Sequence, residues 1–259
     1  MSIEIEMPDL KYFLEEKAEK YNNRDFIESD PIQIPHLFSD KNDIEIAAFF
    51  ASTIAWGQRV TIIKNMHKLI SLMDNAPYDF VMNCSEKELE RLKYFKHRTY
   101  NGEDCKFFVK SLRNIYQKHK GLGELFQGIY SKHNNICDTL INFRTVFFEI
   151  DHQQRTQKHV SNVLKGASAK RLNMFLRWMV RKDNKGVDFG LWNKISKSDL
   201  FLPLDVHTGN VARKLGLLKR KQNDWKAVEQ VTNVLRTFDP VDPIKYDFAL
   251  FGLGVFEEF

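Results

Sequence analysis

Apolar residues along this chain recur mainly at intervals of three and four positions, and strict two-residue alternation is scarce. Such spacing places the apolar residues of a segment on one face of a helix, so it predicts an all-α protein. The predicted helices cover residues 10–21, 43–55, 60–74, 77–82, 86–92, 105–119, 122–133, 137–148, 169–181, 188–195, 205–215, 224–237 and 243–253.

Aspartates at the starts of three predicted helices are expected N-caps, since a short carboxylate can accept hydrogen bonds from the first free N–H groups. They are Asp205, Asp224 and Asp242, and the last is followed by Pro243 at the first helical position.

Composition indicates a soluble, cytoplasmic protein. The 259 residues include 21 Phe and 4 Trp, enough for a packed core, and no apolar run approaches the roughly 20 residues that span a bilayer. The start of the chain carries Glu4, Glu6 and Asp9, which is not the pattern of a signal peptide. Three widely spaced cysteines fit a reducing compartment and match no metal-binding spacing, so no metal or cofactor is expected.

Positive charge is concentrated in one part of the chain. Residues 151–221 hold sixteen Lys and Arg against five Asp and Glu, whereas the whole chain carries only +5. A basic block in an otherwise acidic chain indicates contact with a polyanion, although a solvated Lys/Arg face would look the same.

Within this block, a Gly/Ser-containing turn leads into a strongly amphipathic helix. The turn is Leu164-Lys-Gly-Ala-Ser-Ala, and Lys170 begins the helix. A turn of this kind exposes N–H groups that can bind a phosphate. On a helical wheel Arg177 and Arg181 fall in line with Lys170, opposite the apolar face, so we expect an exposed cationic stripe. The alternative is an ordinary surface helix whose Lys and Arg side chains face solvent and bind no phosphate.

A second stretch, Leu204-Asp205-Val-His207, begins the predicted helix over residues 205–215. As an N-cap, Asp205 would also be fixed in orientation and kept ionised, which suits catalysis. No second His or Cys lies at metal-ligand spacing from His207, so a hydrogen-bonding role is the simpler interpretation.

Together the two stretches resemble the helix-hairpin-helix DNA glycosylase superfamily, which includes endonuclease III. The resemblance makes Gly166 the first hairpin glycine, Lys170 the catalytic lysine and Asp205 the catalytic aspartate. Two positions depart from that pattern: Ser168 replaces the second hairpin glycine and Lys165 replaces a proline. The interval between Lys170 and Asp205 is also longer, and there is no cysteine cluster for an iron–sulfur centre.

The resemblance further implies a set of DNA-contacting residues. The loop between the predicted helices 43–55 and 60–74 would enter the duplex, with Gln58 and Arg59 filling the gap left by an extruded base. Trp56 and His207 are candidates for the base pocket, although a Trp here could also be core. The residues expected to contact the DNA backbone are Lys165, Gly166, Ser168, Arg171, Arg177 and Arg181.

We therefore expect a base-excision repair glycosylase acting on damaged double-stranded DNA as a monomer. With a lysine in place, the enzyme would be bifunctional, joining base removal to strand cleavage through a Schiff base. The resemblance favours an oxidised purine as the lesion, because superfamily members with a long interval between the two catalytic residues include enzymes for oxidised guanine. Three alternatives stay open: a monofunctional enzyme in which Asp205 activates water, a catalytically inactive DNA- or RNA-binding protein of the same fold, and a helical interaction protein without a nucleic-acid role.

No long linker divides the chain, so one compact helical unit is expected. A division into two lobes would group residues 1–40, 140–165 and 205–259, and would place 41–139 and 166–204, with the hairpin, in the other lobe.

Overall fold

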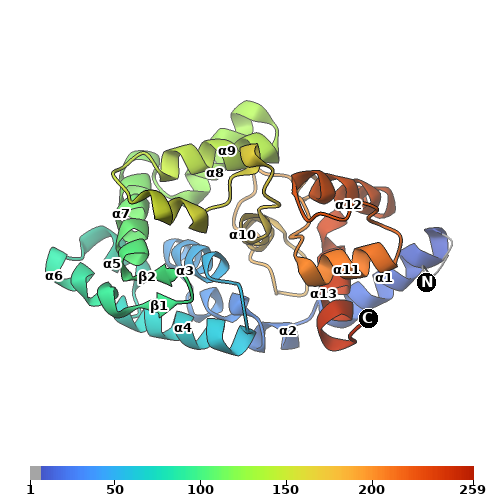
Figure 1. Ribbon diagram of the computed structural model, residues 1–259, viewed down its shortest axis with the longest axis horizontal. Coiled ribbons are helices and arrows are strands. Elements are labelled where there is room, and N and C mark those ends of the chain that lie inside the picture. Colours follow the sequence, from blue (N-terminus) through green and yellow to red (C-terminus); the bar gives the residue numbers. More distant parts are fainter. Residues whose placement is uncertain (1–6) are drawn as a thin grey trace. The chain divides into compact units, whose positions relative to one another are not determined.

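The computed structural model describes residues 7–259 (Figure 1). Glu4 and Glu6, which entered the argument about a signal peptide, lie outside the described residues, as does the start of the predicted range 1–40. Within the described part of the chain, helices dominate and the all-α prediction is confirmed. No helix among residues 7–259 has the length and apolar character needed to cross a bilayer.

The α-helices are α1 (Met7–Tyr21), α2 (Asp25–Glu28), α3 (Lys41–Thr53), α4 (Arg59–Leu72), α5 (Pro77–Asn83), α6 (Glu86–Leu89), α7 (Gly102–His119), α8 (Leu122–His133), α9 (Ile136–Phe147), α10 (Lys170–Val180), α11 (Val206–Lys214), α12 (Trp225–Phe238) and α13 (Tyr246–Phe256). Short 3-10 helices are η1 (Pro31–Gln33), η2 (Pro35–Leu37), η3 (Glu90–Tyr94), η4 (Gln154–His159), η5 (Val163–Lys165), η6 (Lys197–Asp199) and η7 (Pro243–Lys245). Strands β1 (Lys96–His97) and β2 (Tyr100–Asn101) form a small antiparallel hairpin.

The predicted helix over residues 188–195 is wrong. In the structure this segment is irregular and lies against the last turn of α10, where the N–H groups of Phe189 and Trp192 donate to the carbonyls of Trp178 and Met179. Those carbonyls lie at the helix end, where a helix has no internal donors for them. Tertiary hydrogen bonding has therefore replaced the local helical pattern.

Two of the three predicted N-caps are confirmed. The carboxylates of Asp205 and Asp224 accept from the N–H groups of Thr208 and Ala227, at the starts of α11 and α12. The prediction for Asp242 is wrong, because its side chain makes no cap hydrogen bond. The Asp242 carboxylate instead contacts the buried guanidinium of Arg181 and the partly exposed ammonium of Lys197.

The chain divides into two compact units, Met1–Phe26 with Asn162–Phe259, and Ile27–Ser161. This differs from the expected lobes, since residues 166–204 belong with the C-terminal helices and not with residues 41–139. We call the two the first and the second unit and describe each by itself.

In the first unit, α13 packs against both α1 and α11. The contact with α1 is close at Gly252, where an added Cβ would lie 2.1 Å from the ring of Tyr21. Toward α11, a Cβ at Gly254 would lie 3.1 Å from Val211 and 3.3 Å from His207. Small residues on α13 therefore bring α11, and with it the helix start at Asp205, close to the apolar centre of this unit.

The second unit has a core of aromatic rings supplied by α3, α7 and α9. Phe108 is fully buried, and its ring centroid lies 4.8 Å from that of Phe147, 5.2 Å from Tyr100 and 5.8 Å from Phe49. Aromatic pairs at such separations contribute beyond the apolar area that they bury.

Truncation of Phe108 should consequently destabilise the second unit strongly. We expect Phe108→Ala to lower the free energy of unfolding by roughly 3–5 kcal/mol, because it removes a large buried ring and leaves a cavity. Tyr94→Ala, at a side chain that is 72% exposed, should change it by less than about 0.5 kcal/mol. Urea denaturation of both variants measures the difference, and equal effects would contradict this account of the core.

Candidate active site

Lys170 and Asp205 meet in the first unit. Lys170 is the first residue of α10 and Asp205 the N-cap of α11, and the structure brings the lysine Nζ to 4.0 Å from the aspartate Oδ2. Their side chains are 23% and 25% exposed. The two residues that the resemblance made catalytic thus form an ion pair that solvent, and hence a ligand, can reach.

The start of α11 fixes the orientation of Asp205. Its Oδ1 accepts from the backbone N–H of Thr208 at 3.0 Å and from the Thr208 hydroxyl at 3.2 Å, while the Thr208 hydroxyl accepts from the N–H of Asp205. This capping box holds one carboxylate oxygen at the helix end. The other oxygen, Oδ2, is the one that faces Lys170.

A further contact anchors the backbone at Asp205. The amide Nδ2 of Asn223 donates to the carbonyl oxygen of Asp205 at 2.9 Å, and the Asn223 oxygen accepts from Arg213. Gly209 leaves the room for this contact, since a Cβ there would lie 2.8 Å from the Asn223 oxygen. The catalytic candidate is therefore held by both its side chain and its backbone.

The predicted turn before Lys170 is a hairpin built around Gly166. This glycine has a φ of +79°, a left-handed conformation that side chains rarely adopt, and its N–H donates to the carbonyl of Val163. The carbonyl of Gly166 in turn accepts from the N–H of Trp225, which ties the hairpin to the start of α12. Leu164 and Lys165 are exposed at its tip, and Ser168 is half-buried.

The beginning of α10 differs from those of α11 and α12. Its N-cap is Ala169, in a left-handed conformation with φ +50°, and no side chain caps the helix. Uncapped N–H groups and the helix dipole together make such an end suitable for an anion. The hairpin departs from the family pattern at Ser168 and Lys165 but still presents this helix end beside Lys170.

Arg177 and Arg181 do not form an exposed stripe, and this prediction is wrong. Their exposed fractions are 4% and 2%, and Met174 on the same face is 7% exposed. Residues from Leu172 to Val180 are all buried, so α10 is covered on every side beyond its first turn. Neither arginine is available for DNA.

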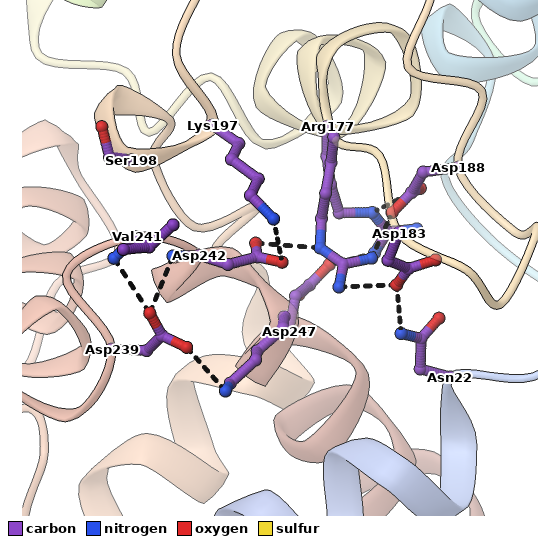
Figure 2. A network of polar contacts seen from close by, with 12 residues as sticks. Asn22, Arg177, Asp183, Asp188, Lys197, Ser198, Asp239, Val241, Asp242 and Asp247 are labelled. Carbon is purple, nitrogen blue, oxygen red and sulfur yellow. Dashed lines mark hydrogen bonds and ion pairs between the residues drawn. The ribbon is translucent and has the colours of Figure 1, made fainter.

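Both arginines belong instead to a network of ion pairs, and Figure 2 shows the part around Arg177 with Asp188, Asp183 and Asp242. Asp188 lies between them, with Oδ1 3.2 Å from Nε of Arg177 and Oδ2 3.0 Å from Nη1 of Arg181. Arg181 also contacts Asp183 at 2.8 Å and Asp242 at 3.0 Å. Burial by itself would lower the pKa of Arg181, but the three carboxylates together raise it, so the guanidinium stays charged.

Asp247 is a functional candidate that the sequence analysis missed. It lies on α13, is 4% exposed and accepts a hydrogen bond from Nη1 of Arg177. Burial raises the pKa of Asp247 to about 6, against the opposing effect of Arg177. The charges of Asp205 and Lys170 act on it as well, the first raising and the second lowering its pKa. A single carboxylate within the apolar run Tyr246–Leu253 was the available signal.

Arg171 and His207 lie near the two ends of the candidate site. Arg171 is half-buried, and desolvation lowers its pKa to about 10, which still leaves it charged at neutral pH. His207, in the first turn of α11, is exposed. The DNA contact expected of Arg171 and the pocket role expected of His207 stay predictions.

The loop residues Trp56, Gln58 and Arg59 lie in the second unit. Gln58 is exposed as the N-cap of α4, while Trp56 and Arg59 are half-buried. The Trp56 ring packs edge-on to His97, with centroids 5.0 Å apart. Burial lowers the pKa of His97, and its neutral ring contacts the Trp56 carbonyl at 3.1 Å. These contacts fix the base of the loop and leave Gln58 at its exposed end.

Among residues 7–259, no group of three or more His, Cys, Asp or Glu side chains is placed to hold a metal ion.

Comparison with known proteins identifies a family but no activity. Residues 30–256 match the family model DUF2400, described as a protein of unknown function. Because the match covers most of the chain, the protein belongs to this family. No curated protein and no solved structure matches it.

Removing Arg181 should test its structural role. Arg181→Met deletes the guanidinium that contacts three carboxylates, and we expect the free energy of unfolding to fall by roughly 3–5 kcal/mol because buried negative charge is left uncompensated. Lys20→Met, at an exposed ion pair with Glu257, should have a much smaller effect. A small loss for Arg181→Met, measured by urea denaturation, would contradict its placement in the network.

The raised pKa of Asp247 predicts a pH dependence of stability. Because the folded protein binds this proton more tightly than the unfolded chain, the contribution is present at low pH and is lost as the pH rises through about 6. Between pH 8 and pH 5, the free energy of unfolding of the wild type should rise by about 1–1.5 kcal/mol relative to that of Asp247→Asn. Urea denaturation across this range measures it, and a constant difference between the two proteins would refute the assignment.

Proposed function

We propose that this protein is a DNA glycosylase with lyase activity, which removes a damaged base from double-stranded DNA through a Schiff base on Lys170. The observation that carries the proposal is the 4.0 Å approach of the Lys170 amine to the Asp205 carboxylate at an accessible position. A resemblance of two separate sequence stretches selected this pair, and the ion pair brings both chemical groups together.

In the proposed reaction, Asp205 accepts a proton from the Lys170 ammonium and leaves the amine free to attack. The lysine nitrogen forms a bond to C1′ as the bond from C1′ to the base breaks, and the base leaves with the bonding electrons and takes up a proton. The sugar ring then opens as the lysine nitrogen forms the iminium. Transfer of a C2′ proton to water and departure of the 3′ phosphate with the bonding electrons from C3′ complete strand cleavage, and hydrolysis of the iminium by water frees Lys170.

The capped position of Asp205 suits this role. Its Oδ1 is held by Thr208, so the carboxylate does not need to reorient when Oδ2 accepts the proton or stabilises positive charge at C1′. Groups held in place before the reaction are more effective than mobile ones, because little reorganisation occurs in the transition state.

In this proposal the hairpin supplies a contact to the DNA backbone. The uncapped start of α10 presents N–H groups, and the exposed Lys165 adds a positive charge at the hairpin tip. In the second unit, Gln58 is exposed and Trp56 and Arg59 are half-buried, and the proposal assigns to this loop the filling of the gap left by an extruded base. Extrusion costs a few kcal/mol, which such contacts would offset.

Borohydride trapping tests the proposal directly. Duplexes carrying 8-oxoguanine, an oxidised pyrimidine, an alkylated purine or an abasic site are incubated with the protein and borohydride, which reduces the Schiff base to a stable amine. We expect the wild type to form a covalent adduct with at least one duplex. Lys170→Ala should form none, and Asp205→Asn should react at least about a hundredfold more slowly. Lys11→Ala, at an exposed lysine of α1, is the matched control and should react as the wild type does.

Each other outcome contradicts a definite part of the proposal. Base release without an adduct would remove the lysine chemistry and leave Asp205 activating water. Salt-dependent binding to DNA with no reaction on any duplex would favour the inactive binding protein instead. An adduct that persists in Lys170→Ala would place the nucleophile elsewhere.

A further inference from the structure

A line of alternating charges runs through the first unit and ends at the candidate site. Lys197 contacts Asp242 at 3.2 Å, and Asp242 contacts Arg181. From Arg181 the line continues through Asp188 and Arg177 to Asp247, each joined to the next by an ion pair (Figure 2). The line ends at Asp247, on which the charges of the Lys170–Asp205 pair also act.

The position of Arg177 on α10 places this line of charges on the face of the helix that also carries Lys170. Arg177 follows Lys170 by seven positions, almost two full helical turns, so the two side chains leave α10 on the same face. Asp247 meets this face from α13, which also packs against α11, the helix that begins at Asp205. A buried carboxylate is therefore held on the side of α10 that carries the proposed nucleophile.

We propose that Asp247 is a positioning residue of the Lys170–Asp205 site, whose buried negative charge stabilises the cations formed on Lys170 and on C1′ during the reaction. This inference rests on the proposed function and adds to it the residue that acts from behind the nucleophile. Asp247 touches neither substrate nor reacting atom in this role and acts through the field of its charge.

The balance of buried charges supports an electrostatic role. The four carboxylates of Asp183, Asp188, Asp242 and Asp247 exceed the two guanidinium groups of Arg177 and Arg181, and the partly exposed Lys197 compensates only one of them. Among these seven groups the carboxylates therefore outnumber the cations by one. Since charges act more strongly in a poorly hydrated interior than in water, the Asp247 carboxylate stabilises the positive charge that develops at C1′ and on the iminium nitrogen once the neutral Lys170 amine has attacked.

The charged groups near Asp247 lie on α10, α11 and α1 and around the ring of Phe248. Its α10 neighbours are Arg177 and Lys170, and from α11 it experiences the charge of Asp205. Arg181 lies over the ring of Phe248, with its guanidinium carbon 5.5 Å from the centroid, and contacts three other carboxylates. On α1, Glu15 accepts from Tyr246 and pairs with Lys245.

The coupling can be measured without any DNA. Carbon-13 NMR of the Asp247 carboxyl gives its titration midpoint in the wild type and in variants of the site. Because Asp205 raises and Lys170 lowers this pKa, the midpoint should move down in Asp205→Asn and up in Lys170→Ala. Asp9→Asn, at an exposed residue of α1, should leave it unchanged. Unchanged midpoints in both site variants would overturn the inference.

The catalytic consequence is measured by the rate of borohydride trapping as a function of pH. Wild-type trapping should rise as Asp247 ionises near pH 6, whereas Asp247→Asn should be roughly tenfold to a hundredfold slower and lack this rise. Asp183→Asn removes a carboxylate from the same network through its contact with Arg181, and should keep the wild-type pH midpoint. A purely structural role of Asp247 would make the two variants alike.

The outcomes separate this inference from the function on which it rests. Adduct formation by the wild type with an unchanged rate and pH profile in Asp247→Asn would overturn the role of Asp247 and leave the glycosylase standing. Failure of the wild type to react with every duplex would overturn the glycosylase, and with it the catalytic role of Asp247. If Asp247→Asn does not fold, the NMR midpoints in Asp205→Asn and Lys170→Ala still decide the matter.

Discussion

Two buried guanidinium groups, one on α10 and one directly after its last residue, impose the main constraint on the first unit. A charge can be removed from water only if opposite charges and hydrogen bonds replace the solvent, so Arg177 and Arg181 require carboxylates from elsewhere in the chain. These come from the irregular segment after α10 and from the last part of the chain, and they draw both against the same helix. The carboxylates are Asp183, Asp188, Asp242 and Asp247.

The same constraint explains why helical periodicity predicted the shared face of α10 correctly but predicted its exposure to solvent wrongly. A wheel correctly places Lys170, Arg177 and Arg181 on one face, but it cannot tell whether water or protein covers that face. The covering groups include Asp188, which is near in sequence, and Asp242, which is distant. Charge balance over a window of residues likewise does not distinguish exposed cations from paired ones, and two cations of the basic block are paired inside the protein.

Local signals succeeded where the structure depends on neighbouring residues. The cap at Asp205 and the turn at Gly166 follow from side-chain reach and backbone conformation within a few positions. The segment 188–195 failed because its conformation depends on the end of α10 and on the burial of Trp192, which packs edge-on to Phe175. The approach of Lys170 to Asp205 is likewise a tertiary feature, and only resemblance to a known family could suggest it.

A buried network of this kind is a weak source of stability, since apolar side chains of similar size often do as well. The advantage of the network lies in the fixed orientation of the charged groups around α10. The start of α10 is uncapped and carries the positive end of the helix dipole, an unfavourable place for the Lys170 ammonium. Asp205 from one side and Asp247 from behind supply negative charge that offsets this. The first turn of α10 can then hold a cation and remain open to an anion, two properties that a lysine acting on a phosphate-bearing substrate would need together.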